Sequence, residues 1–280
     1  MVLTVDIPLI RLADGDVWSV LLMRSGATLV VALLLWVVWR LWRGNAPALV
    51  PGRAGAAVAA LYGLGSVLFM LAVFNTSTAN LVFILAFNTA FAALLSWAFL
   101  RERPHPVTLA AIAVMIGAVL LIVGDGIGRG NLLGDMLGLG SAFAIASAIT
   151  VTRASGRDMG LTALVAVALP LAVAAFMVAE NGFRVTEPGW MLLNGAIVMP
   201  VAFFCLATGP KYISGPEVAM FYLLETVLAP VWVWIIFAEA PSRVSLIGGA
   251  LLVLTLFAHS LWQLETARRR RATPLPRHPA

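Results

Sequence analysis

The acid best placed to do chemistry in this chain is Glu225, near the centre of a long apolar stretch. A carboxylate at the middle of a membrane helix costs about 2.5–3.5 kcal/mol on insertion scales, so a chain that keeps one is expected to use it. On a helix Tyr222, Ala229 and Trp232 share its face within about 80°. An acid, a phenol and an indole suit an ammonium or aromatic group. The pattern predicts a substrate-binding face. The alternative is a protonated Glu225 that only packs against a neighbouring helix.

Further polar residues are expected to line the same cavity. Pro230 removes the usual donor to the Thr226 carbonyl group, which predicts a kink and a polar backbone atom one residue from the glutamate. A second apolar stretch carries three polar residues within a similar arc of about 80°, and a third carries two that are one turn apart. The five residues are Ser77, Asn80 and Asn88, then Tyr62 and Ser66.

Three prolines and one arginine are candidates for movement. Pro170 and Pro200 lie near the middles of two other apolar stretches, where they break the hydrogen-bond ladder, so together with Pro230 they are predicted hinges. Arg24 lies about four residues inside an apolar boundary, a depth from which its side chain can snorkel to the interface. We expect it to anchor the helix, with gating or binding of a substrate carboxylate as the alternative.

The elements that must position these residues are membrane helices. Nine stretches of about 20 apolar residues run along the chain, the length that crosses a hydrocarbon core of about 30 Å. With 61% hydrophobic and 11% charged residues, too little polar surface remains to cover a soluble fold. The predicted helices cover 17–39, 54–74, 77–100, 106–124, 132–152, 161–179, 189–210, 213–238 and 244–264. The expected fold class is an all-α polytopic membrane protein.

Basic residues set the expected orientation. The 18 lysines and arginines divide 13 to 5 between the two sets of alternating stretch ends. The positive-inside rule therefore predicts a cytoplasmic C-terminus and an external N-terminus. The first 16 residues are too short to cross and do not fit a cleavable signal peptide. The basic tail from residue 267 is expected to contact anionic membrane lipids.

An internal repeat divides the chain. A shift of 137 residues aligns two pairs of predicted helices, and each copy ends in an acid followed two residues later by proline, Glu102-x-Pro104 and Glu239-x-Pro241. The aligned helices run in opposite directions, which predicts two inverted repeats with a binding site between them. The expected parts are a first half, a linker, a second half and a tail, at 1–125, 126–131, 132–266 and 267–280.

This sequence shows no motif that is typical of an enzyme active site. It contains no Walker A, HExxH or GxSxG motif and no metal-spaced His/Cys cluster, and the one cysteine is Cys205. The glycine-rich segment 124–135 is expected to be a linker, because a phosphate-binding GxGxxG needs a preceding strand. We therefore expect no enzyme, no cofactor and no metal. Nucleic acid is not an expected partner either, since the basic residues are dispersed among loops.

The inverted halves, the acid–proline ends and the segment around Glu225, LLETVLAPVWVWIIFAEAP, resemble the EamA-type permeases of the drug/metabolite transporter superfamily. The resemblance implies secondary transporters of ten helices in two five-helix repeats, which move amino acids and other small metabolites, often outward. Here four predicted helices precede the linker and five follow it, so the family's first helix is expected to be missing. A start codon assigned too late is favoured over a nine-helix variant or a remnant.

The expected function is therefore secondary transport of a small amphipathic metabolite, with amino acids as the leading class, by alternating access. The alternative is a membrane protein that does not transport, or a subunit that needs a partner. Protons are a candidate coupling ion, and a bacterial inner membrane is the expected location. Small residues recur every four positions at Gly134, Gly138, Ala142 and Ala146. Such a stripe favours packing within one chain, as a monomer or weak homodimer.

Overall fold

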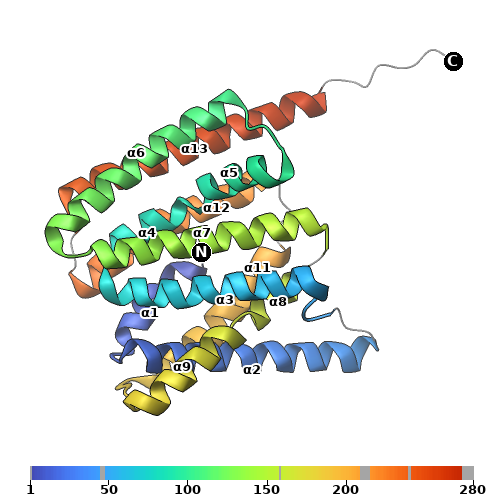
Figure 1. Ribbon diagram of the computed structural model, residues 1–280, viewed down its shortest axis with the longest axis vertical. Helices are drawn as coiled ribbons and strands as arrows, with labels where there is room; N and C mark the ends of the chain where they lie inside the picture. Colours follow the sequence, from blue (N-terminus) through green and yellow to red (C-terminus); the bar gives the residue numbers. More distant parts are fainter. Residues whose placement is uncertain (1, 45–47, 158, 209–214, 239–240, 273–280) are drawn as a thin grey trace.

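The computed structural model describes residues 2–44, 48–157, 159–208, 215–238 and 241–272, and the structural statements below concern these residues. They form a bundle of helices that run back and forth (Figure 1). In chain order the helical elements are η1 (Val2–Val5), α1 (Asp6–Leu12), α2 (Val17–Arg43), α3 (Gly52–Asn75), α4 (Thr78–Ala86), α5 (Asn88–Leu100), α6 (Pro106–Arg129), α7 (Leu132–Ser155), α8 (Gly160–Val165), α9 (Ala168–Asn181), α10 (Pro188–Leu193), the π-helical turn η2 (Asn194–Val198), α11 (Met199–Thr208), α12 (Gly215–Phe237) and α13 (Arg243–Ala272).

The all-α membrane class is confirmed. Eight spans in the described ranges are long and apolar enough to cross a membrane, and Thr226–Phe237 of α12 is a shorter apolar segment. Short links join successive spans, so their directions alternate, and α4–α5 runs opposite to α12, its counterpart in the repeat. The end of the bundle at which α2 begins, on the left in Figure 1, is called the Val17 end below.

Three of the predicted helices are broken near their middles. The expected helix 77–100 is interrupted at Phe87, 161–179 between α8 and α9, and 189–210 by the π-helical turn η2. Pro170 and Pro200 explain two of these breaks, because neither can donate to the carbonyl group four residues earlier. At Phe87 no proline intervenes; the backbone N–H of Phe87 bonds to the Ile84 carbonyl at 3.0 Å, a tighter i→i+3 pattern.

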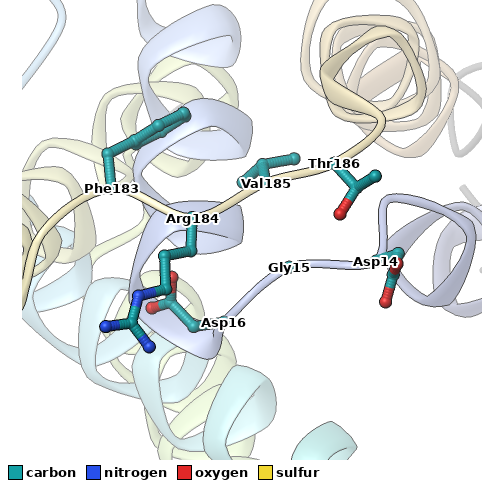
Figure 2. Close-up of a pocket in the computed structure, with 7 residues that line it drawn as sticks. All are labelled: Asp14, Gly15, Asp16, Phe183, Arg184, Val185 and Thr186. Atoms are coloured by element: carbon teal, nitrogen blue, oxygen red, sulfur yellow. The ribbon is translucent and has the colours of Figure 1, made fainter.

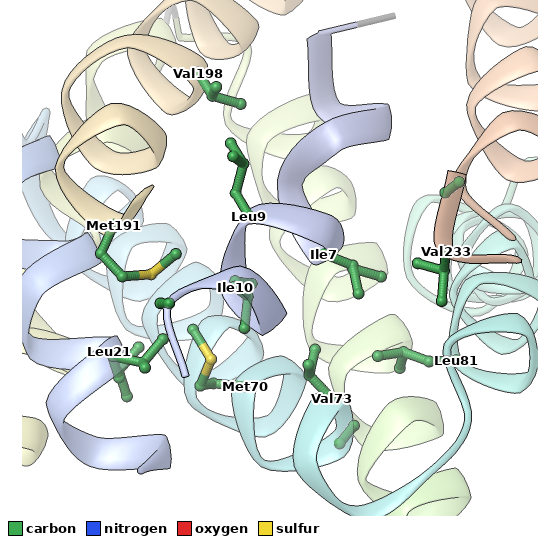
Figure 3. Packing of buried hydrophobic residues seen from close by; sticks show 14 of the residues in the cluster. Ile7, Leu9, Ile10, Leu21, Met70, Val73, Leu81, Met191, Val198 and Val233 are labelled. Atoms are coloured by element: carbon green, nitrogen blue, oxygen red, sulfur yellow. The ribbon is translucent and has the colours of Figure 1, made fainter. Parts of the chain in front are cut away.

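Residues ahead of α2 are too few to cross a membrane, but they do not project from the bundle. Instead α1 packs inside the bundle, where Ile7 and Ile10 are buried (Figure 3). They share one hydrophobic cluster with Met70 of α3 and Met191 of α10. The segment is short and mostly apolar, and it packs against apolar side chains of neighbouring helices. It ends beside the start of α2, so its earlier residues reach into the bundle from the Val17 end.

The link between the halves is also shorter than expected. Helix α6 continues through most of the expected linker 126–131 and ends at Arg129, where Gly130, with a φ of 77°, forms a left-handed C-cap. Asn131 donates its backbone N–H to the Gly126 carbonyl at 2.9 Å, which completes that cap. Only Gly130 and Asn131 separate α6 from α7. Gly130 therefore serves helix capping, Gly126 and Gly134 serve close packing, and two residues make the link.

The small residues of α7 pack within the chain. Ala142 and Ala146 are fully buried, and a Cβ atom added at Gly138 would lie 3.1 Å from Leu81 Cδ1. A Cβ atom at Gly134 would lie 2.6 Å from the backbone nitrogen of Thr76, at the junction of α3 and α4. The stripe thus brings α7 of the second half against the first half, as small-residue packing in membranes predicts.

The start of α2 is fixed by a side-chain cap. Asp16 accepts hydrogen bonds from the backbone N–H groups of Trp18 and Ser19, at 3.1 and 3.2 Å. Asp16→Ala should cost about 1 kcal/mol of unfolding free energy, the usual loss for an N-cap acceptor. Denaturation followed by tryptophan fluorescence in detergent would measure it. Asp16→Asn, which keeps an acceptor oxygen, should stay near wild type, and an equal loss in both variants would rule out the cap.

Candidate functional site

A buried ion pair lies inside the bundle in the half nearer the Val17 end. Arg24 of α2 and Asp6 of α1 are joined by a 2.9 Å bond between Nη2 and Oδ2, and their side chains are only 7% and 9% exposed. The sequence predicted that the Arg24 side chain snorkels to the interface. Its burial in this ion pair shows instead that it points into the bundle. Ionisable side chains within membrane spans are rare, and they mark substrate or ion pathways by default.

Asn194, the first residue of the π-helical turn η2, holds the pair in place. Its amide oxygen accepts from Arg24 Nε at 3.2 Å, and its Nδ2 donates to Asp6 Oδ1 at 2.7 Å. The Met199 sulfur lies 3.3 Å from Arg24 Nη2, and the Phe69 ring centroid lies 5.6 Å from the guanidinium carbon. These five residues are called the Arg24 cluster. Each charge in it is paired and hydrogen-bonded, as a buried charge requires.

The backbone around the Arg24 cluster is shaped to let α2 and η2 touch. A Cβ atom added at Gly195 would lie 2.5 Å from the Arg24 carbonyl oxygen, so only glycine permits the contact. The Thr28 hydroxyl lies 2.9 Å from both the Arg24 and the Gly195 carbonyl oxygens and ties the two helices together. A π-helical turn is rare and frequently marks a functional site. Here it points Asn194 at the ion pair.

The sequence-predicted residues of α4 lie apart from this cluster. Ser77 caps α4 by accepting from the Asn80 backbone N–H at 3.3 Å. The Asn80 side chain is buried and accepts from the Ser245 hydroxyl of α13 at 2.5 Å. Asn88 is half-buried and begins α5, directly after the break at Phe87. Ser77 and Asn80 are thus in contact, whereas Asn88 lies about two helical turns beyond Asn80.

The structure describes some of the predicted site residues on α3 and α12. Tyr62 and Ser66 are half-buried. Between them Gly63 packs against the α8–α9 break: a Cβ atom added at Gly63 would lie 2.9 Å from the Ala166 carbonyl oxygen. On α12, which remains one helix through Pro230, Thr226 is buried and Trp232 is 40% exposed. The side chains of Tyr222 and Glu225 lie outside the described part of the chain.

Sequence reasoning missed two candidate functional residues, although each is a polar residue within an apolar segment. Asp6 lies in the short N-terminal segment, for which the sequence predicted only that it is too short to cross the membrane. Asn194 lies inside the apolar stretch 189–210, six residues before a predicted hinge proline. A buried amide in such a stretch is as unusual as a hydroxyl or an acid, and it could have been weighed with Asn80 and Asn88.

A shallow hollow of about 460 Å³ lies at the Val17 end, where two loops cross (Figure 2). Gly15 and Val185 form an isolated antiparallel bridge there, and Asp16 donates its backbone N–H to the Arg184 carbonyl at 3.1 Å. A Cβ atom at Gly15 would meet that carbonyl oxygen at 2.8 Å. The bridge ties the α1–α2 loop to the α9–α10 loop, above the Arg24 cluster.

Comparisons with known proteins agree with this architecture. A protein of Synechocystis sp. described as an uncharacterized transporter is 30% identical over 84 residues, which cover 30% of this chain and 24% of the relative. One solved crystal structure of a protein superposes with a TM-score of 0.64 at 16% identity, covering 93% of this chain and 94% of the other, and so shares the fold. The EamA-like transporter family matches residues 7–124 and again residues 132–261. The chain is therefore a multi-pass membrane protein of the EamA-like transporter family.

Proposed function

We propose that this protein is a secondary transporter that moves a small amphipathic metabolite, with amino acids as the leading class, by alternating access. The observation that carries the proposal is the buried Asp6–Arg24 pair, which Asn194 of the interrupted span α10–η2–α11 holds by hydrogen bonds. Transporters place substrate sites at discontinuous helices near the midplane, because freed backbone groups and charges can face a cavity there. Family membership and the relative described as a transporter support the same function.

An amino acid carries a carboxylate and an ammonium group, and the chain offers a partner for each. Arg24 can bind a carboxylate in a planar, bidentate arrangement, the geometry at which guanidinium groups excel. In the structure the Asp6 carboxylate occupies this position and bonds to both Arg24 and Asn194. In this proposal a substrate carboxylate displaces Asp6 when the halves rock apart, and Glu225 meets the ammonium group. The breaks at Pro170 and Pro200 serve as the hinges of that movement.

Proteoliposomes containing the full chain and a panel of radiolabelled amino acids test the proposal. We expect saturable uptake of at least one class, above protein-free vesicles, with competition by the unlabelled compound. Cys205→Ser, at an exposed position outside the proposed site, should transport like wild type. Arg24→Lys should lower the apparent affinity more than the maximal rate, because lysine cannot form the bidentate contact. Folded protein that moves no member of the panel would reject amino acids as substrates.

Glu225→Gln tests the second half of the site. If the acid meets a substrate ammonium group, the amide should weaken uptake of zwitterionic and cationic amino acids. If it also couples transport to protons, flux should lose its dependence on an imposed pH gradient. Unchanged uptake and unchanged gradient dependence would assign Glu225 to packing alone. Fusing a reporter active only in the cytoplasm to the C-terminus, in a bacterial host, tests the proposed inner-membrane location and orientation.

A further inference from the structure

A carboxyl group without a hydrogen-bond partner on one oxygen lies at the start of α7. Asp135 is fully buried, at 0% exposure. Its Oδ1 accepts from the Thr76 hydroxyl at 2.6 Å, whereas Oδ2 has no hydrogen-bond partner among the described residues. Nearly every buried polar atom in a folded protein is paired, so an orphaned carboxyl oxygen calls for an explanation.

No positive charge of the described structure compensates Asp135. From α6 it faces Asp125, another acid, whose carboxylate is paired with Arg129 at 3.0 Å. Arg129 is 55% exposed and committed to that pair. From α4 it faces the Asn80 amide, and from the α3–α4 junction the Thr76 hydroxyl; both favour the carboxylate by hydrogen bonding, but neither carries a charge. Arg243, which begins α13, is exposed. The charged group that acts on the buried acid, Asp125, therefore has the same sign.

The glycine opposite Asp135 makes room for its unpaired oxygen. A Cβ atom added at Gly126 of α6 would overlap Asp135 Oδ2, whereas one added at Gly124 would meet nothing within 4 Å. Gly126 and Asp135 lie on the two sides of the link between the halves. The carboxyl group is thus held in the contact between α6 of the first half and α7 of the second.

We propose that Asp135 is a proton-binding site: its carboxyl group holds a proton while this contact is closed and releases it when the contact opens to water. Burial without a countercharge penalises the carboxylate, and the like charge of Asp125 adds to the penalty. The N-terminus of α7 favours an anion, but a helix end offsets only a small part of the cost of taking a carboxylate out of water. Binding of one proton makes the carboxyl group neutral and removes this penalty.

A polar route leads from the bundle surface toward this proton. Asp125, with its side chain 14% exposed, accepts from the Ser242 hydroxyl at 2.5 Å. The Ser242 and Ser245 hydroxyl oxygens are 2.9 Å apart, and Ser245 donates to Asn80. The route links α6, α13 and α4 beside Asp135. Because it crosses between the two halves, proton binding would change with their relative position; this coupling step rests on the proposed transport function.

Infrared spectroscopy of the reconstituted full chain tests the site without any transported solute. A protonated carboxyl group has a C=O stretching band separate from that of a carboxylate, and it shifts in deuterium oxide. We expect one component of this band to disappear at neutral pH in Asp135→Asn and to remain in Asp125→Asn. The asparagine can still accept from Thr76, and thermal denaturation checks that the variant folds. A band unchanged in Asp135→Asn would overturn the proposal.

The glycine pair supplies a second, independent readout. Gly126→Ala should shift or remove the same band component, because the added methyl group displaces Oδ2. Gly124→Ala should leave it in place. Equal spectra in the two variants would contradict the assignment. If instead the band is absent from wild type, and added sodium raises the melting temperature of wild type but not of Asp135→Asn, the acid binds a metal cation and the proton proposal fails.

The coupling role is tested separately in proteoliposomes. A substrate identified with the amino-acid panel should be driven by an imposed pH gradient in wild type. In Asp135→Asn we expect substrate exchange to continue while gradient-driven accumulation falls at least tenfold. Accumulation that stays gradient-driven in this variant would remove Asp135 from coupling. If wild type moves no solute, the transport proposal fails, while the infrared result still decides whether Asp135 binds a proton.

Discussion

Replacing Arg24 with methionine is expected to cost about 3–5 kcal/mol of unfolding free energy, the range found when one partner of a buried ion pair is removed. Methionine matches much of the volume of the arginine stem but leaves Asp6 buried without its positive partner. It also leaves the Asn194 amide oxygen without the Arg24 donor. Equilibrium unfolding in mixed micelles, followed by tryptophan fluorescence, measures the loss against wild type.

The double variant Asp6→Asn with Arg24→Met separates pairing from packing. Once the acid is neutral, no uncompensated charge stays buried, so much of the lost stability should return. Asp6→Asn alone should also destabilise, since it leaves Arg24 as the unpaired charge. A thermodynamic cycle over these variants isolates the interaction of the two side chains. Losses that simply add would show that Asp6 and Arg24 do not interact, and the proposed displacement of Asp6 by a substrate would lose its basis.

The positions of the membrane helices follow from hydropathy, and the breaks within them follow only in part. Span ends agree to within a few residues because apolar runs and charged loops fix them. Pro170 and Pro200 carry a visible signal, since the missing N–H acts through the local backbone. The break at Phe87 carries none: its residue types are ordinary for a membrane helix, so it depends on packing with neighbours that the sequence does not identify.

The candidate site was harder to predict than the helices, because its contacts join distant segments. Asp6 and Arg24 are close enough in sequence to be paired by inspection, but only after the short segment that holds Asp6 is known to fold inward. Asn194 is joined to both across more than 160 positions. Asp135 was passed over inside a glycine-rich segment expected to be a linker, since no local pattern reveals that α6 and α7 almost touch there.

Gly134→Ala is the second change for which a large effect is expected. An added Cβ atom would lie 2.6 Å from the Thr76 backbone nitrogen and even closer to the backbone of Asn75. These are backbone atoms at a helix junction, so they cannot rotate away as a side chain does. Overpacking of this kind typically costs about 1–3 kcal/mol, and a clash with backbone should reach the upper part of that range. Thermal denaturation in detergent measures it.

Two matched glycines decide whether the loss comes from close packing or from glycine replacement as such. At Gly138 the nearest atom is the flexible Leu81 Cδ1, 3.1 Å from an added Cβ atom, so alanine there should cost little. At Gly117 of α6 nothing lies within 4 Å, and alanine should stabilise the helix by about 0.5–1 kcal/mol. Stability should therefore increase in the order Gly134→Ala, Gly138→Ala, Gly117→Ala. If Gly134→Ala is no less stable than Gly117→Ala, α7 does not rest on the α3–α4 junction, and the buried setting of Asp135 would fall with that contact.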